Sequence, residues 1–262
     1  MDPLPPADIA GRLRAERFGR PLVYAPRLTS TQTLAAQLAA RAWPEGTIVL
    51  AEEQTAGRGR QGRAWFAPWG QALLLSAVLR PNLALARASQ ITMLAALAAA
   101  EAIENVCSLP ISLKWPNDLY RRGRKLGGIL TETQLAADGA RLEVAIVGIG
   151  VNVAVDFTAQ PALQATATSL HREAERPPAR ADLLLELLLR LEARYREVVA
   201  GGSCHAAWSQ RLLWIGEPVR VVSAQGVVRG IARGVDDQGA LLVERDDGAI
   251  ETVWAGDVTP AN

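Results

Sequence analysis

The stretch GRGRQGR, residues 57–63, alternates glycines with arginines and could bind an anion through backbone N–H and guanidinium groups. Its glycines match the spacing G-x-G-x-x-G, which in dinucleotide-binding proteins brings a pyrophosphate to the start of a helix. Here Pro68 breaks any helix that starts at the last glycine, and no acidic residue lies between Glu53 and Glu101 to hold a ribose. The dinucleotide interpretation therefore fails, and the loop needs another ligand.

Three further stretches carry polar or charged side chains next to turns. They are STQ at residues 30–32, the pair KWPND and RKLGG within residues 114–128, and GIGVN at residues 148–152. Taken singly, a glycine-rich turn is most often only a turn, and a run of arginines is most often a solvated surface. Together with residues 57–63, the stretches form a specific set.

Apolar runs and their periodicity predict the elements that position these stretches. Strands are predicted at residues 21–26, 47–54, 71–79, 111–118, 124–134 and 141–153, and helices at residues 30–42, 85–106, 180–200 and 204–213. The short connections favour antiparallel neighbours, so the expected fold class is α+β, with a mixed β-sheet and packed helices. Residues 171–181 are expected to be an exposed loop before the last long helix.

The pattern changes near Trp214, where short strand-like runs alternate with the turns QG, DDQG and DDG. These are hairpin signals at regular spacing, and they predict a small all-β barrel or sandwich. The predicted organisation is therefore a larger domain over residues 1–213, with a short N-terminal segment at 1–20, followed by a small β-domain over residues 214–262.

Composition limits the partners. The formal net charge of the 262 residues is +1, so no global field attracts nucleic acid or an anionic membrane, and an anion site must be built locally. Cys107 and Cys204 match no metal or redox spacing and are expected to be buried thiols of a reducing compartment. The apolar segments are too short or too interrupted by charge to span a bilayer, which favours the cytoplasm.

The four stretches, in this order and spacing, closely resemble the catalytic domain of the biotin protein ligases (biotin-[acetyl-CoA-carboxylase] ligases). Residues 214–262 resemble the C-terminal SH3-like β-barrel domain of that family. The resemblance implies that biotin and ATP give biotinyl-AMP and pyrophosphate, and that a specific lysine of a biotin carboxyl carrier protein takes the biotinyl group. The carrier would belong to acetyl-CoA carboxylase or a related biotin-dependent carboxylase. ATP and Mg²⁺ are the implied cofactors, although the sequence shows no direct metal-binding motif.

The resemblance also implies roles for individual residues. Lys125, Arg60 and Asp118 match the catalytic positions, with Lys125 contacting the biotin carboxylate and the α-phosphate. Asp118 would orient Lys125 or the attacking lysine, or help to place the metal. The positions that match the biotin site are Ser30, Thr31, Gln32, Gln54, Gly57, Arg58, Gly59, Arg60, Lys125, Gly127 and Gly128. The positions that match the ATP site are Arg60, Trp65, Asn117, Lys125, Gly148, Gly150 and Asn152.

Two features of these positions lead to expectations of their own. Gln32 stands where the family commonly has asparagine, and it carries the same amide on a longer arm. Trp65 would stack on adenine after residues 57–63 close over the ligand. This loop is expected to be mobile in the free protein, because its cations would have a partner only in the anionic groups of the ligand.

No DNA partner is expected either. Family members that are also repressors carry a helix-turn-helix domain ahead of the catalytic domain, and such a domain needs about 50 residues or more. About 20 residues precede the strand predicted at 21–26, so the chain is expected to be a ligase of the monofunctional type.

Two rival functions stay open on the residues alone. A related ligase or transferase would act on lipoate or octanoate, but the polar residues Ser30, Thr31 and Gln54 suit a ureido ring better. A nucleic-acid-binding module would use the arginine loop and the small β-domain, but the near-neutral charge disfavours it. Competition between biotin and lipoate tests the first, and the salt dependence of nucleic-acid affinity tests the second.

Overall fold

The computed structural model describes residues 3–4 and 6–261, and its larger part is built around an eight-stranded mixed sheet. The strand order is β1-β2-β3-β8-β7-β6-β5, and the short strand β4 pairs with β8. Strands β1 and β2 are parallel, and the other neighbours are antiparallel. The strands are β1 (Leu22–Leu28), β2 (Ile48–Gln54), β3 (Ala72–Leu79), β4 (Leu83–Ala84), β5 (Ser112–Lys114), β6 (Asp118–Arg121), β7 (Arg124–Leu135) and β8 (Arg141–Asn152).

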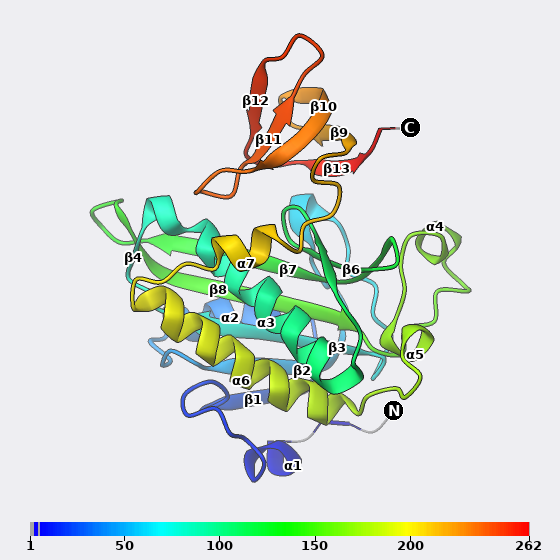
Figure 1. The fold of residues 1–262 in the computed structure, drawn as a ribbon. Helices are drawn as coiled ribbons and strands as arrows, with labels where there is room; N and C mark the ends of the chain where they lie inside the picture. The colour runs from blue at the N-terminus through cyan, green and yellow to red at the C-terminus, as the bar shows by residue number, and fades with distance from the viewer. Residues whose placement is uncertain (1–2, 5, 262) are drawn as a thin grey trace.

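Helices cover both faces of this sheet. In Figure 1, α3 and α6 lie in front of the strands and α2 lies behind them. The helices are α1 (Pro6–Ala10), α2 (Thr31–Ala40), α3 (Ser89–Cys107), α4 (Pro161–Gln164), α5 (Leu170–Glu173), α6 (Arg180–Val199) and α7 (His205–Ser209), with 3-10 turns η1 (Arg60–Gly62) and η2 (Leu85–Arg87). The expected α+β fold with a mixed sheet is confirmed.

The alternation of side chains along the strands explains the two layers. Ile48 and Leu50 of β2 point into the main core with the buried residues of α3 and α6, whereas Val49 packs with α2 on the opposite face. Val144 and Ile146 of β8 extend the α2 side. The α2 face is therefore apolar beneath that helix, and it is the face on which the functional cavity opens further along the strands.

A second sheet of five antiparallel strands forms the C-terminal part, drawn above the large sheet in Figure 1. Its order is β12-β11-β10-β9-β13, with strands β9 (Pro218–Ser223), β10 (Gly226–Val235), β11 (Leu241–Glu244), β12 (Ile250–Val253) and β13 (Asp257–Pro260). The separate β-domain expected at the C-terminal end is therefore present. Its boundary at residue 214 stays a prediction.

The segment 111–118 differs from the sequence expectation. It forms two antiparallel strands, β5 and β6, in place of one. In the backbone register of this hairpin, Lys114 lies opposite Asp118. The N–H of Asn117 closes this turn by donating to the carbonyl of Lys114 at 3.1 Å. Pro116 cannot donate to a strand ladder, which is why the chain turns there. The turn brings Lys114, Asn117 and Asp118 to one end of the sheet.

Two short helices, α4 and α5, were also missed. They follow β8, in a segment whose residues have no helical period, so pattern reasoning had no signal there. One residue of this segment, Ala167, forms an isolated parallel bridge with Lys125 of β7.

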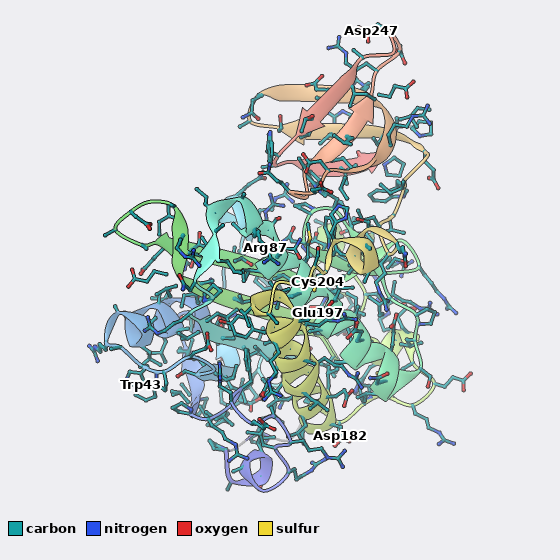
Figure 2. The ribbon with its side chains drawn as sticks, turned by 60° about the vertical axis from the view of Figure 1, so that its left-hand side comes forward. Trp43, Arg87, Asp182, Glu197, Cys204 and Asp247 are labelled. Carbon is teal, nitrogen blue, oxygen red and sulfur yellow. The ribbon has the colours of Figure 1, made fainter. Side chains whose placement is uncertain are left out.

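Long-range polar contacts hold both ends of α6. Asp182 in its first turn forms an ion pair with Arg12, and Arg87 donates to the carbonyls of Val198 and Gly202 at the other end. Figure 2 shows this arrangement, with Asp182 at one end of the helix and Glu197 near the opposite end, toward Arg87. A cation at the helix C-terminus also compensates the helix dipole. Within the described residues, no helix is long and apolar enough to cross a membrane.

We expect Leu188→Ala to lower the free energy of unfolding by about 2–5 kcal/mol, because it leaves a cavity in a tightly packed core. Leu188 is fully buried on α6. The matched control on the same helix is Val199→Ala, since Val199 is 42% exposed and its loss should change stability by less than about 0.5 kcal/mol. Urea unfolding measures both. Equal effects of the two substitutions would contradict the packing described for α6.

Candidate active site

A cavity of about 720 Å³ lies beside α2 and reaches to the small β-domain. Its walls come from the start of α2, the loop 57–63, the β5–β6 turn, strands β7 and β8, and β13. The cavity is polar and uncharged at the end near α2. It is rich in cations at the end near the β-domain.

Glycines make the floor of this cavity. Along β8, Val144 and Ile146 pack beneath α2, and the next two residues on the same face are Gly148 and Gly150. A Cβ atom at Gly148 would lie 2.7 Å from Oε1 of Gln32, and one at Gly150 would lie 2.8 Å from ring carbons of Trp65. Only glycine therefore leaves room for these side chains above the sheet.

The uncharged end is a network of hydroxyl and amide groups. The backbone N–H and Oγ1 of Thr31 both donate to Oε1 of Gln54, at 2.7 and 3.0 Å. Oγ of Ser76 lies 2.9 Å from Oγ1 of Thr31 and 3.1 Å from Oε1 of Gln32. Ser30 joins them in lining this end. The network offers fixed donors and acceptors to a small polar ring.

Ser76 was missed by sequence reasoning. It is the single polar residue in the buried strand Ala72–Leu79, and a lone hydroxyl in an apolar strand is a signal for a buried polar contact. Its partner Gln32 is also buried, and Nε2 of Gln32 donates to the carbonyl of Ile146 at 3.0 Å. The long arm of Gln32 thus reaches the sheet across Gly148.

The loop 57–63 is attached to its surroundings by all three of its arginines. Arg58 forms an ion pair with Glu132 of β7 at 3.3 Å, and Arg60 donates to Oδ1 of Asn117 at 3.0 Å. Arg63 donates through both terminal nitrogens to Oδ2 of Asp257, at 3.1 Å each. The premise that these cations have partners only in a ligand is therefore wrong, because three different elements of the protein hold them.

Lys125 lies at the centre of the cationic end. Its Nζ is 2.7 Å from Oδ1 of Asp118 and 5.7 Å from the centre of the Trp65 ring. Gly128 lies beside this pair, and a Cβ atom there would be 3.2 Å from the same Asp118 oxygen. Of the roles considered for Asp118, orienting Lys125 is the one this contact favours.

The backbone around Lys125 is held by the segment after β8. Lys125 donates its N–H to the carbonyl of Thr166 at 2.8 Å and accepts from the N–H of Thr168 at 2.9 Å. Asn152 donates to the carbonyl of Thr168 at 3.1 Å, and its side chain is buried. Asn152 was expected on the nucleotide side. In the structure, its amide instead holds Thr168, the residue that is hydrogen-bonded to the backbone of Lys125.

A second ion-paired lysine was also missed. Nζ of Lys114 lies 2.6 Å from Oδ1 of Asp257, and it lies over the rings of Tyr120 and Trp214 at 5.6 and 5.8 Å. Because 143 residues separate Lys114 from Asp257, no local pattern could pair them. This contact joins the small β-domain to the cavity wall.

The charges in this pair stabilise each other. Burial alone would raise the pKa of Asp257, but the neighbouring cations Lys114 and Arg63 outweigh it and lower that pKa below its usual value. Burial alone would lower the pKa of Lys114, but the hydrogen bond to Asp257 and the charges nearby raise it. Both groups are therefore charged at neutral pH.

Nearly all the residues assigned by resemblance meet in this cavity. Gly57 and Gly127 do not line it. A Cβ atom at Gly127 would lie 2.7 Å from the carbonyl oxygen of Gly150, and one at Gly57 would lie 3.0 Å from that of Trp65. Both glycines therefore permit close packing behind the cavity wall. The assigned residues that line it are Ser30, Thr31, Gln32, Gln54, Arg58, Gly59, Arg60, Trp65, Asn117, Asp118, Lys125, Gly128, Gly148, Gly150 and Asn152.

The cavity wall has too few carboxylates to coordinate a metal ion with protein ligands alone. Across residues 3–4 and 6–261, no group of three or more His, Cys, Asp or Glu side chains is placed to hold one. The carboxylates in the cavity wall, Asp118 and Asp257, each face a lysine. A divalent ion at this site would need oxygen ligands from a bound phosphate.

Two family models match the chain. Residues 24–152 match the model of the Biotin/lipoate A/B protein ligase family, and residues 214–259 match the Biotin protein ligase C terminal domain. The class is therefore that of ligases for biotin or lipoate.

Individual relatives narrow the class. The chain is 38% identical to the bifunctional ligase/repressor BirA of Bacillus subtilis, over 96% of this chain and 78% of the relative. It is 35% identical to the biotin–[acetyl-CoA-carboxylase] ligase of Mycobacterium tuberculosis, over 90% and 87% of the two chains. The solved biotin protein ligase of Aquifex aeolicus in complex with biotin and ATP matches with a TM-score of 0.77 and 28% identity, over 92% and 99%. The chain belongs to the biotin protein ligase family.

We expect Gly150→Ala to displace Trp65 and weaken nucleotide binding, because the new methyl group overlaps the indole ring. Overpacking of this kind costs about 1–3 kcal/mol, and the same loss in binding would correspond to roughly fivefold to 150-fold in the dissociation constant of ATP. Calorimetric titration with ATP measures it. Gly11→Ala is the control, since nothing lies within 4 Å of a Cβ atom there. Unchanged ATP affinity in the Gly150 variant would contradict the role expected of Trp65 in nucleotide binding.

Proposed function

We propose that the protein binds biotin and ATP together in the cavity of about 720 Å³ and catalyses the formation of biotinyl-AMP there. One observation supports this best. The cavity has an uncharged, hydrogen-bonding end and a cationic end, and the backbone of Gly148 and Gly150 forms the floor between them. Ser30, Thr31 and Gln54, with Ser76, would bind the ureido ring of biotin. The valeryl chain would then run over Gly148 toward Lys125.

The chemistry requires two anions to meet. An oxygen of the biotin carboxylate attacks the α-phosphorus of ATP, and pyrophosphate leaves with the electron pair of the broken P–O bond. Fixed cations lower the repulsion between the reactants and stabilise the charge that develops in the transition state. Lys125 and Arg60 line the cavity wall at the cationic end, and we assign them this task. Asp118 would keep the Lys125 ammonium in position.

Mg²⁺ would enter with the nucleotide, bound mainly by phosphate oxygens and at most one carboxylate of the cavity, which is its usual mode in proteins that bind nucleotides. When bound, it would neutralise part of the triphosphate charge.

The acceptor in the second half of the reaction would be a lysine on a biotin carboxyl carrier protein. Relatives named biotin–[acetyl-CoA-carboxylase] ligase support a carrier that belongs to such a carboxylase. We propose the cytoplasm as the compartment, since Cys107 and Cys204 are free thiols, as expected of a reducing environment.

Lipoate is the rival substrate, and the polar network argues against it. The dithiolane ring of lipoate has no N–H or carbonyl group to pair with Thr31, Gln54 and Ser76. Leaving those groups unpaired around an apolar ring would cost binding energy. A competition titration should show that excess lipoate fails to displace biotin.

We expect the purified protein to catalyse exchange of labelled pyrophosphate into ATP only when biotin is present. This half-reaction reports adenylate formation without a carrier. A lysine-bearing carrier domain added afterwards should become biotinylated. The absence of biotin-dependent exchange, with ATP and Mg²⁺ present, would overturn the proposed function.

Lys125→Ala should lower the rate of exchange on the order of a hundredfold or more, while biotin affinity changes by only a fewfold, because the charge acts mainly in the transition state. Lys125→Arg keeps the charge but changes its geometry, so it should retain part of the rate. Rapid mixing measures the rate, and calorimetry measures the affinity. An alanine variant within a fewfold of the wild-type rate would remove Lys125 from the catalytic role.

The expectation that the chain does not act as a DNA-binding repressor stays a prediction. One of its relatives is named a bifunctional ligase/repressor, and the chain spans 78% of that protein. Anisotropy titration on promoter DNA with biotin and ATP present tests the prediction. Nanomolar, sequence-selective binding at physiological salt would contradict it.

A further inference from the structure

Lysine is almost missing from this sequence. Of the 28 basic residues that are not histidine, two are lysines, Lys114 and Lys125, so the other 26 are arginines. Both lysines line the large cavity, Lys114 at the end of β5 and Lys125 near the start of β7. The sequence therefore offers no lysine amine away from the cavity in which the proposed function places biotinyl-AMP.

Amines matter because an acyl-adenylate reacts with them. A neutral lysine amine uses its lone pair to form a C–N bond with the adenylate carbonyl carbon. The C–O bond to the phosphate breaks, AMP leaves with that electron pair, and the amine loses a proton to solvent. An ammonium has no lone pair, and a guanidinium stays protonated in proteins, so neither reacts in this way.

We propose that this chain is shielded from acylation by its own product, because its outer positive charges are arginines and its two lysines are held as ammonium groups by carboxylates. This inference rests on the proposed function, and it concerns the choice of acceptor. The biotinyl group can then be passed to the lysine of a partner and not to the enzyme.

Lys114 carries the clearest evidence for such a restraint. Its side chain is 9% exposed, it lies 2.6 Å from Asp257, and the Tyr120 and Trp214 rings stabilise its charge. Arg63 holds the second oxygen of Asp257, which keeps that carboxylate ionised and oriented toward the ammonium. The raised pKa of Lys114 agrees with this geometry: burial alone would lower it, and the hydrogen bond to Asp257 together with the charges nearby outweighs that effect.

Lys125 is restrained in a similar way. Asp118 accepts from its Nζ at 2.7 Å, and the Trp65 ring faces the same nitrogen at 5.7 Å. The ammonium can therefore act as a fixed charge toward phosphate without competing as an acceptor. In both pairs the carboxylate has a positioning role that acts through a lysine.

The first test supplies synthetic biotinyl-AMP to the purified wild-type protein without a carrier, followed by peptide mapping by mass spectrometry. We expect no biotinyl group on Lys114 or Lys125. Modification of either lysine in the wild type would overturn the proposal. Because the adenylate is supplied, this result can be read even if biotin-dependent exchange fails, so it is separate from the test of the proposed function.

The second test removes the charge that restrains Lys114. In Asp257→Asn, with folding checked by circular dichroism, we expect biotinylation of Lys114 to rise by about tenfold or more, as for a pKa lowered by about one unit or more. Asp257→Glu should restore protection, and adding Lys114→Arg to Asp257→Asn should abolish the signal. A folded Asp257→Asn variant that protects adenylate from hydrolysis but leaves Lys114 unmodified would refute the role of the ion pair.

The third test examines the arginines. Arg229 is exposed on β10 and does not line the cavity. Arg229→Lys keeps the charge but adds a reactive amine, so slow biotinylation at residue 229 is expected while Lys114 and Lys125 stay unmodified. If the introduced lysine resists biotinyl-AMP as fully as the native pair, the arginine-rich surface gives no protection and the proposal is wrong.

Discussion

The cavity depends on one steric constraint, the absence of side chains at Gly148 and Gly150. Strand β8 begins as an ordinary buried strand with Val144 and Ile146 beneath α2, and the same face then becomes bare backbone. Gln32 and Trp65 use the space that results, one at each end. Any larger residue at these two positions would close the floor between the uncharged and the cationic ends. A ligand with a polar ring and a distant carboxylate needs both ends at once.

The cationic end is stabilised by pairs formed between separate parts of the chain. Lys125 faces Asp118 across β6 and β7, Arg58 faces Glu132, and Asp257 from the small β-domain accepts from both Arg63 and Lys114. Concentrated positive charge is costly without such partners, because like charges repel most strongly where water is excluded. The carboxylates thus allow several lysine and arginine side chains to lie close together before a triphosphate is bound. Two of them, Asp257 and Asp118, also hold Lys114 and Lys125 in ion pairs, on which the proposed protection from self-acylation depends.

The small β-domain consequently forms part of the wall of the candidate active site. Asp257 connects it to the loop 57–63 and to the β5–β6 turn, and the indole N–H of Trp115 in that turn donates to the carbonyl of Gly239 at 2.9 Å. The turn that bears Lys114, Asn117 and Asp118 is therefore held by the second domain as well as by its own sheet. Movement of this domain would shift the cations that face the ligand. The position of the small β-domain and the placement of these cations are therefore linked through the same contacts.

The sequence by itself determined the main elements and the family. Apolar runs and helix periodicity are local properties of the chain, so strands such as Ala72–Leu79 and helices such as Arg180–Val199 could be predicted, and the motifs around residues 57–63 and Lys125 indicated the ligand. Only the tertiary structure decided that Ser76 joins the uncharged end, that Asn152 supports the backbone beside Lys125, and that Asp257 pairs with Lys114. These contacts join residues far apart in the chain, and the energy of such a pair depends on distances that arise only when the sheet, the loop and the second domain pack together.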